Sequence, residues 1–151
     1  MFLQKTDLPS TMYNYQLEQI TEGNDDIIDV AMAAAEEEVR SYLSGNHKKE
    51  WLDGRLQYDV EAILTASGTD RNALILKHAI TIAKWWIVEL CNADVIYEQT
   101  KERYDRAINW LKQLANGEVN LSTLPTLDPD SEDAIEREPF IYGSRKKFNH
   151  E

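Results

Sequence analysis

"DRNALILKHAITIAKWWIVELC", residues 70–91, has an apolar pattern that predicts one long helix. Its polar residues Lys77, Thr81 and Lys84 follow helical spacing and form a narrow stripe on an otherwise apolar cylinder. A helix of this kind must be covered on most of its sides. We therefore predict a central helix that has Asp70 as its N-cap and packs within this chain or between copies of it.

Two further helices are predicted on the N-terminal side of this segment. Ser10 and Thr11 are suited to begin a short helix, in which Tyr13, Leu17 and Ile20 recur at helical spacing. A stronger helix begins at Asp25 or Asp26 and ends at Gly45. The apolar stripe expected on that second helix consists of Ile27, Val30, Ala31, Ala34, Ala35, Val39, Tyr42 and Leu43.

A fourth helix is predicted from about Val95 to Ala115, and Asn116-Gly117 ends it, with Gly117 suited to a left-handed conformation. The segment from Asn46 to Thr69 is broken by two glycines, so we interpret it as a connection that contains a short helical or extended piece at 58–64. The buried stripe expected on the fourth helix consists of Tyr97, Tyr104, Ala107, Ile108, Leu111, Leu114 and Ala115.

The chain of 151 residues is long enough for one ordinary hydrophobic core, and 42% of its residues are hydrophobic. After residue 127 the composition changes: DPDSEDAIERE, residues 128–138, holds six acids against one Arg. FIYGSRKKFNHE follows at 140–151. With so few aliphatic residues this part cannot form a core of its own. We predict an all-α bundle of four to five helices at 1–127 and an extended C-terminal arm at 128–151 that is ordered on partners.

The net charge of −11 argues against tight binding of nucleic acid phosphates, which needs clustered Lys and Arg. Cys91 is the single cysteine, so no intrachain disulfide is possible. The N-terminus lacks the pattern of a secretory signal, and charged residues interrupt the apolar run at 74–90. These features predict a protein made in the cytoplasm without a membrane span.

No pattern for catalysis or for cofactor binding is present, and we expect no enzyme, no metal and no cofactor. His47, His78 and His150 lie far apart, and His78 is interpreted as a satisfied imidazole at the core or its edge. The acids at 128–139 resemble a calcium loop but lack its glycine and its final glutamate. The run Glu36-Glu37-Glu38 is interpreted as a solvated helix face.

The aromatic residues are more informative about partners. Trp110 falls roughly 100° from the centre of the apolar stripe on its helix, so it is either a residue at the core margin or an anchor for a neighbouring subunit. Of Trp85 and Trp86, one is expected to face the core and the other a neighbouring chain. The candidate residues for binding a partner or a neighbouring subunit are Trp110, Phe140, Ile141, Tyr142, Gly143, Arg145, Lys146, Lys147 and Phe148.

Five segments together give a resemblance to a known family. They are MFLQKTDL at 1–8, YDVEAI at 58–63, DRNALIL at 70–76, RYDRAINWLKQLANGEVN at 103–120 and YGSRKKFNH at 142–150. In these segments the chain resembles the Mu-like prophage protein family, which is grouped by position and shape with phage head-tail connector proteins. The fourth and fifth segments are the most specific, and the resemblance covers nearly the whole chain.

The resemblance implies a structural virion protein at the head-tail junction. It implies a ring of twelve copies beneath the portal, a C-terminal arm that reaches the portal or a neighbouring subunit, and contact with a tail or neck protein. Double-stranded DNA would pass through the ring without specific binding, and an acidic lumen would suit that passage. Two alternatives stay open: a neck or tail-completion protein, and an acidic helical module that regulates a basic partner.

Overall fold

The computed structural model describes residues 1–10, 12–45, 56–91 and 97–127. The helices in these ranges are η1 Lys5–Ser10, α1 Asn14–Thr21, α2 Asp25–Gly45, α3 Val60–Thr65, η4 Gly68–Asp70, α4 Ala73–Leu90 and α5 Tyr97–Asn116, where η marks a 3-10 helix. No strand occurs there, and the β-type contact is an isolated bridge between Tyr58 and Thr126. The predicted all-α fold is confirmed, whereas the arm at 128–151 lies outside the described residues.

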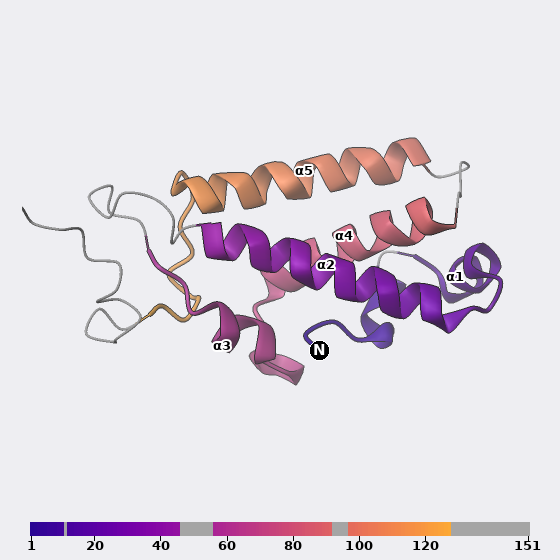
Figure 1. Cartoon of the computed structure of the whole chain (residues 1–151), viewed down its shortest axis with the longest axis horizontal. Coiled ribbons are helices and arrows are strands. Elements are labelled where there is room, and N and C mark those ends of the chain that lie inside the picture. Colours follow the sequence, from indigo (N-terminus) through magenta and orange to yellow (C-terminus); the bar gives the residue numbers. More distant parts are fainter. Residues whose placement is uncertain (11, 46–55, 92–96, 128–151) are drawn as a thin grey trace, which may run out of the picture.

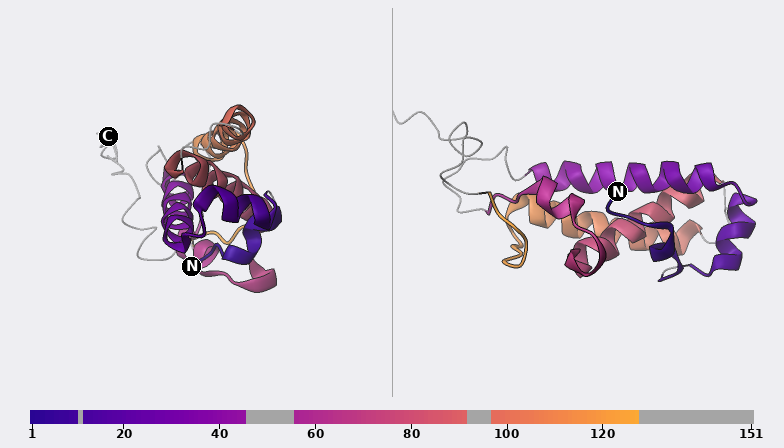
Figure 2. Two further views of the ribbon diagram at one scale, coloured as in Figure 1. Left: turned by 90° about the vertical axis from the view of Figure 1, so that its right-hand side faces the viewer. Right: turned by 90° about the horizontal axis from the view of Figure 1, so that it is seen from below.

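The three long helices α2, α4 and α5 pack against one another in all three pairings. Figure 1 shows that α4 runs antiparallel to α2 and α5. As a result, the start of α2, the end of α4 and the start of α5 meet at one end of the bundle, next to α1. The views in Figure 2 show α2 along one side of the molecule, with α4 and α5 beside it. The opposite end of the bundle holds the end of α5 and the segment that follows it.

The prediction that α4 is the central helix is confirmed by its burial. Of its polar stripe, Lys77 is exposed and Thr81 and Lys84 are half-buried, whereas the other residues between Leu74 and Val88 are buried or half-buried. Its buried residues are Ile75, Ala79, Ile80, Ile82, Ala83, Ile87 and Val88. Because burial of one isoleucine side chain contributes roughly 1.5–3 kcal/mol, the isoleucines of α4 outweigh any single polar contact in this fold.

The start of α4 differs from the prediction by two residues. Asn72, rather than Asp70, is the N-cap, and its Oδ1 accepts hydrogen bonds from the backbone N–H groups of Leu74 and Ile75 at 3.0 and 3.1 Å. Arg71, which lies between Asp70 and Asn72, has an extended backbone, and its guanidinium donates to the Asp7 carboxylate at 2.6 and 3.1 Å. This ion pair accounts for the later start, because Arg71 must remain outside the helix to reach the N-terminal segment.

The N-terminal segment belongs to the core, which the sequence did not indicate. The side chains of Phe2, Leu3 and Leu8 are almost completely buried. The backbone N–H of Leu3 donates to Glu36 Oε1 on α2 at 2.7 Å, and Arg71 also donates to the carbonyl of Phe2 at 2.9 Å. The apolar residues of segment 1–10 do not recur at helical spacing, so sequence periodicity could not reveal that Phe2, Leu3 and Leu8 are buried.

The buried face of α2 is rotated relative to the predicted stripe. Its buried residues are Ile28, Ala31, Met32, Ala35, Val39 and Leu43. Val30, predicted to be buried, is 57% exposed, and Ile27, Ala34 and Tyr42 are half-buried. Apolar residues surround the first half of α2 on several sides, so the sequence alone did not define which face is covered.

The first helix and the last also depart from their predicted stripes at one end. In α1, Leu17 is buried and Ile20 packs against the core, but Tyr13 is 68% exposed and caps the helix without a side-chain hydrogen bond. In α5, Ala107, Ile108, Leu111 and Leu114 are buried as predicted, whereas Tyr97 is exposed and Tyr104 and Ala115 are half-buried. Gly117 has the predicted left-handed backbone, with φ 75°.

The connection before α4 contains the predicted short helical piece, which is α3. Asp59 caps it by accepting from the backbone N–H of Ala62 at 3.0 Å. The chain after α5 packs beside this connection: the N–H of Asp59 donates to the carbonyl of Pro125, and the buried hydroxyl of Tyr58 accepts from the N–H of Leu121 at 2.9 Å. Residues 46–55 of the connection lie outside the described ranges.

Candidate partner-binding surfaces

Trp110 lies at the margin of the core, as predicted from its position on the helical wheel. It is half-buried, and its ring stacks on the imidazole of His78 in α4, with centroids 4.6 Å apart and planes at 17°. One face of the indole is therefore occupied within the chain. Whether it also anchors a neighbouring subunit stays a prediction.

The interpretation of His78 as a satisfied imidazole is wrong for one of its nitrogens. In the part of the chain that the structure describes, the buried Nε2 has no hydrogen-bond partner. Burial, and secondarily the nearby charge of Lys77, lowers the pKa of His78. The neutral form of this side chain is therefore favoured in the folded protein.

The other predicted site residues belong to the arm, and the structure does not test them. Phe140, Ile141, Tyr142, Gly143, Arg145, Lys146, Lys147 and Phe148 all lie outside the described ranges. Their proposed role continues to rest on their composition.

Glu38 does not belong to a solvated face, and only Glu37 in the run Glu36-Glu37-Glu38 is exposed. The Glu38 carboxylate accepts from Trp86 Nε1 at 3.0 Å and from the Tyr104 hydroxyl at 2.6 Å. It thereby joins α2 to both α4 and α5. Burial, followed by the hydrogen bond to Glu38, raises the pKa of Tyr104 above its usual range. The sequence held no signal for this contact, because the helical period does not specify which neighbouring helix a carboxylate meets.

Trp85 and Trp86 are both half-buried and both contact side chains of their own chain. Trp86 donates to Glu38, as described above. The ring of Trp85 lies between two tyrosines of α5, at 5.1 Å from Tyr104 and 5.2 Å from Tyr97 between centroids. Both indoles thus pack within their own chain, and the expectation that one of them also faces a neighbouring chain stays a prediction.

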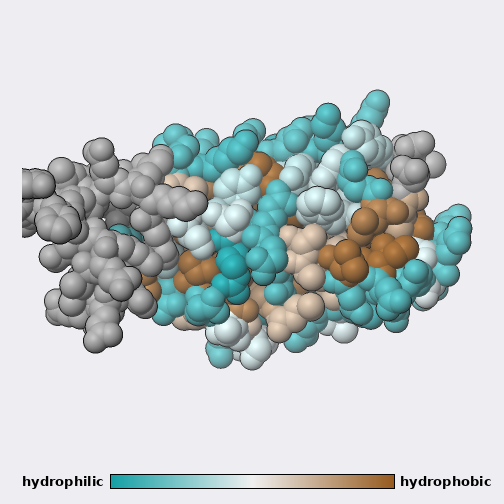
Figure 3. Space-filling view, viewed as in Figure 1, coloured by the Kyte–Doolittle hydropathy of each residue, from teal (hydrophilic) through white to brown (hydrophobic). Residues whose placement is uncertain are grey.

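Exposed apolar side chains gather at the end of the bundle where α1 lies, which we call the α1 end. The residues concerned are Tyr13, Tyr15, Val30, Leu90 and Tyr97. Figure 3 shows hydrophobic surface over this end of the molecule, near the end of α4 and the first half of α2. The rings of Tyr13 and Tyr15 stack on each other with centroids 5.7 Å apart and are 68% and 63% exposed. Grouped exposure of this kind is typical of a surface that binds a partner.

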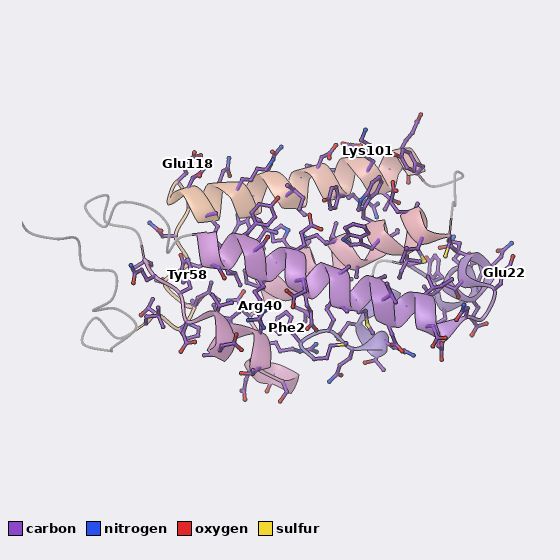
Figure 4. The ribbon with its side chains drawn as sticks, in the orientation of Figure 1. Phe2, Glu22, Arg40, Tyr58, Lys101 and Glu118 are labelled. Carbon is purple, nitrogen blue, oxygen red and sulfur yellow. The ribbon has the colours of Figure 1, made fainter. Side chains whose placement is uncertain are left out.

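The α1 end is also acidic. Figure 4 shows Glu22 at this end, whereas Tyr58 and Glu118 lie at the opposite end. Burial, and then the negative charge of Glu22, raises the pKa of the Cys91 thiol at the end of α4. Glu22 therefore lies near Cys91, which follows the exposed Leu90. The exposed acids on the elements of this end are Glu18, Glu22, Asp25, Asp26, Glu89 and Glu98.

No group of three or more potential metal ligands occurs among the described residues. Within the same ranges, none of the helices has the length and apolar character needed to cross a bilayer.

The comparisons with known proteins identify a phage family. The family model described as Bacteriophage Mu, Gp36 matches residues 2–137. The match includes all of the described helices and Trp110 and ends before residues 140–148. No curated protein and no solved structure matches the chain. Since the model covers nearly the whole chain, the protein belongs to the Bacteriophage Mu Gp36 family of phage proteins.

Proposed function

We propose that the protein is a structural component of the virion that connects the phage head to the tail. Copies of the chain would form a ring beneath the portal, and DNA would pass through the lumen of that ring. The observation that carries this proposal is the family match over residues 2–137, since it restricts the chain to a phage protein family. In this role the protein would act as a structural component and would need neither catalysis nor a cofactor.

The two ends of the bundle differ in a way that supports assembly. The α1 end exposes aromatic and acidic side chains, whereas the opposite end holds Leu127, from which the chain continues into residues 128–151. A ring is built from heterologous contacts, in which each copy offers two unlike surfaces that complement each other. A bundle with two unlike ends meets that requirement.

The net charge of −11 supports passage of DNA through such a ring, because like charges prevent adhesion to phosphates. In a ring of this protein we expect acids to face the lumen. A ring structure in which all acids lie on the outer surface would contradict this part of the proposal.

Electron microscopy of the protein mixed with the portal protein of the same phage tests the proposal directly. We expect a ring on the lower face of the portal, and filled heads without tails when the gene is deleted. A chain that stays monomeric beside the portal would instead support the regulatory module. Complete head-to-portal assemblies that contain no such ring, but stall at a later step of tail joining, would support the neck or tail-completion role.

A further inference from the structure

The exposed apolar side chains of the α1 end favour binding of an apolar partner segment. Tyr13 and Tyr15 offer two stacked, exposed rings, and Val30, Leu90 and Tyr97 add apolar area from three other helices. Burial of such area in a complex is favourable, because it removes apolar surface from water. The surface therefore fits a segment that is itself aromatic or aliphatic.

The negative charge of the α1 end also limits which partners can bind there. Six exposed acids lie on α1 or directly after it, on the first turn of α2, at the end of α4 and at the start of α5. Two bases lie near this end, so the acids outnumber them: Lys5 is paired with Asp25 at 3.5 Å and with Asp29 at 3.2 Å, and Lys101 is exposed near the start of α5 (Figure 4). A partner segment should therefore carry positive charge beside its apolar side chains, since complementary charge favours association and like charge opposes it.

One segment of the chain itself has this combination. Residues 140–150, FIYGSRKKFNH, contain four large apolar side chains, three consecutive bases and no acid. We propose that residues 140–148 of one copy bind the α1 end of a neighbouring copy. This inference rests on the proposed function, which supplies the neighbouring copy. The family match ends at residue 137 and does not cover the binding segment.

The length of the arm and the place where it begins favour a neighbouring copy over the same copy. The described chain ends at Leu127, at the end of the bundle opposite α1, where its N–H donates to the carbonyl of Gln57. Helix α2 has 21 residues and therefore spans about 31 Å. The thirteen residues from 128 to 140 could cover about 43 Å when fully extended, but a chain of that length without regular structure spans about 20 Å on average.

The α1 end of the same copy thus lies beyond the average reach of the arm. When two copies are arranged head to tail, the α1 end of the neighbouring copy lies next to Leu127, after which the arm begins. The acids at 128–138 are repelled by the acids of the α1 end, so they suit a spacer rather than the bound segment. This contact is heterologous, the type of contact from which a ring is built when the rotation between neighbouring copies closes.

Disulfide trapping with the full-length chain tests the inference. In a Cys91→Ser background, one chain carries Ser144→Cys, which keeps every base and aromatic residue of the arm. A second chain carries Gln19→Cys, at an exposed position one helical turn from Tyr15. The matched control chain carries Gln113→Cys, an exposed position in the last turn of α5 at the opposite end. The single-cysteine chains are mixed and oxidised, so that a mixed dimer reports only contacts between copies.

We expect roughly tenfold more mixed dimer with Gln19→Cys than with Gln113→Cys, because docking raises the effective concentration of the thiols. The excess should fall when salt is raised from about 0.1 to about 1 M, since the Debye length shrinks from roughly 10 to 3 Å. Equal yields at both positions, or no mixed dimer, would overturn the inference. A disulfide that forms only when Gln19→Cys and Ser144→Cys share one chain would also overturn it, because the arm would then bind its own copy.

Electron microscopy of the same preparation with the portal separates this inference from the proposed function. Rings on the portal without the Gln19 disulfide would reject the arm contact and leave the connector role intact. The Gln19 disulfide without any ring on the portal would reject the connector role and leave the contact between copies intact.

Discussion

The hydroxyl of Tyr104 donates a hydrogen bond of 2.6 Å to Glu38 Oε1, across 66 residues of sequence. The other carboxylate oxygen of Glu38 accepts from Trp86 Nε1. One half-buried carboxylate therefore holds a donor from each of the other two long helices. Since hydrogen bonds to charged groups are roughly twice as strong as neutral ones, this contact fixes the relative positions of α2, α4 and α5.

Removal of this carboxylate should destabilise the bundle. We expect Glu38→Ala to lower the free energy of unfolding by about 1–3 kcal/mol, because the donors of Trp86 and Tyr104 lose their acceptor in a half-buried site. Urea denaturation followed by circular dichroism measures the change. Glu37→Ala is the matched control at the exposed neighbouring position, with an expected change within about 0.5 kcal/mol. Equal losses for the two variants would show that the Glu38 contacts contribute nothing beyond a surface acid.

The ion pair between Asp7 and Arg71 should make stability depend on pH in the acid range. The hydrogen bond from Arg71 lowers the pKa of Asp7 below its usual value. The pair's contribution is therefore complete above the unfolded pKa of about 4 and is lost as pH falls through the lower folded pKa. We expect Asp7→Asn to lower the free energy of unfolding by about 1.5–3 kcal/mol at pH 7.

Urea denaturation of wild type and Asp7→Asn at pH 7, 5 and 2 measures this dependence. The two proteins should differ by the same amount at pH 7 and 5 and should converge at the lowest pH. A difference that persists unchanged at pH 2 would contradict the assignment, because Asp7 would then contribute without its charge.

His78 should make stability depend on pH in the same direction as Asp7, but in a higher pH range. Its pKa is lowered by burial, so the folded state favours the neutral imidazole, and stability falls as pH drops below the unfolded value of about 6.5. His78→Phe keeps a ring against Trp110 and removes the buried Nε2 that has no hydrogen-bond partner among the described residues. We expect wild type to lose more stability than this variant between pH 7 and 5, as measured by thermal unfolding. Parallel pH profiles would rule out His78 as the titrating group.

Deletion of residues 139–151 should separate folding from assembly. The described core is built from residues up to 127, so we expect the circular dichroism spectrum and unfolding midpoint of the helical core to be retained. Assembly onto the portal should be blocked, because the arm's aromatic and basic side chains are lost. An unchanged yield of tailed particles would refute this role of the arm.

Trp110 can be tested separately from the arm. Trp110→Phe preserves a ring against His78, so stability should change by less than about 1.5 kcal/mol, as expected for a similar hydrophobic side chain. If Trp110 is also an anchor for another subunit, this variant should weaken assembly on the portal although the core stays folded. Normal assembly together with normal stability would leave Trp110 as a core-margin residue alone.

The sequence predicted the segments that form the three long helices because helix signals are local, although α4 starts two residues later than predicted. The apolar pattern of 70–91 predicted α4 and its central position, Gly45 and Gly117 marked helix ends, and the wheel position of Trp110 predicted its place at the core margin. Helical period, end signals and burial of an all-round apolar helix each depend on residues within a few turns of one another. The arm at 128–151, which composition predicts, lies outside the described residues and stays a prediction.

The contacts between elements required the folded chain, because they join residues far apart in sequence. Glu38 meets Trp86 and Tyr104 at separations of 48 and 66 residues, and Arg71 meets Asp7 at 64. A helical wheel ranks the faces of one helix but does not say which neighbour covers them, so Val30 was placed in the core although α4 and α5 cover the adjacent face of α2. The α1 end combines exposed residues from four helices that are far apart in sequence. For the same reason, no single segment of the sequence could predict this surface.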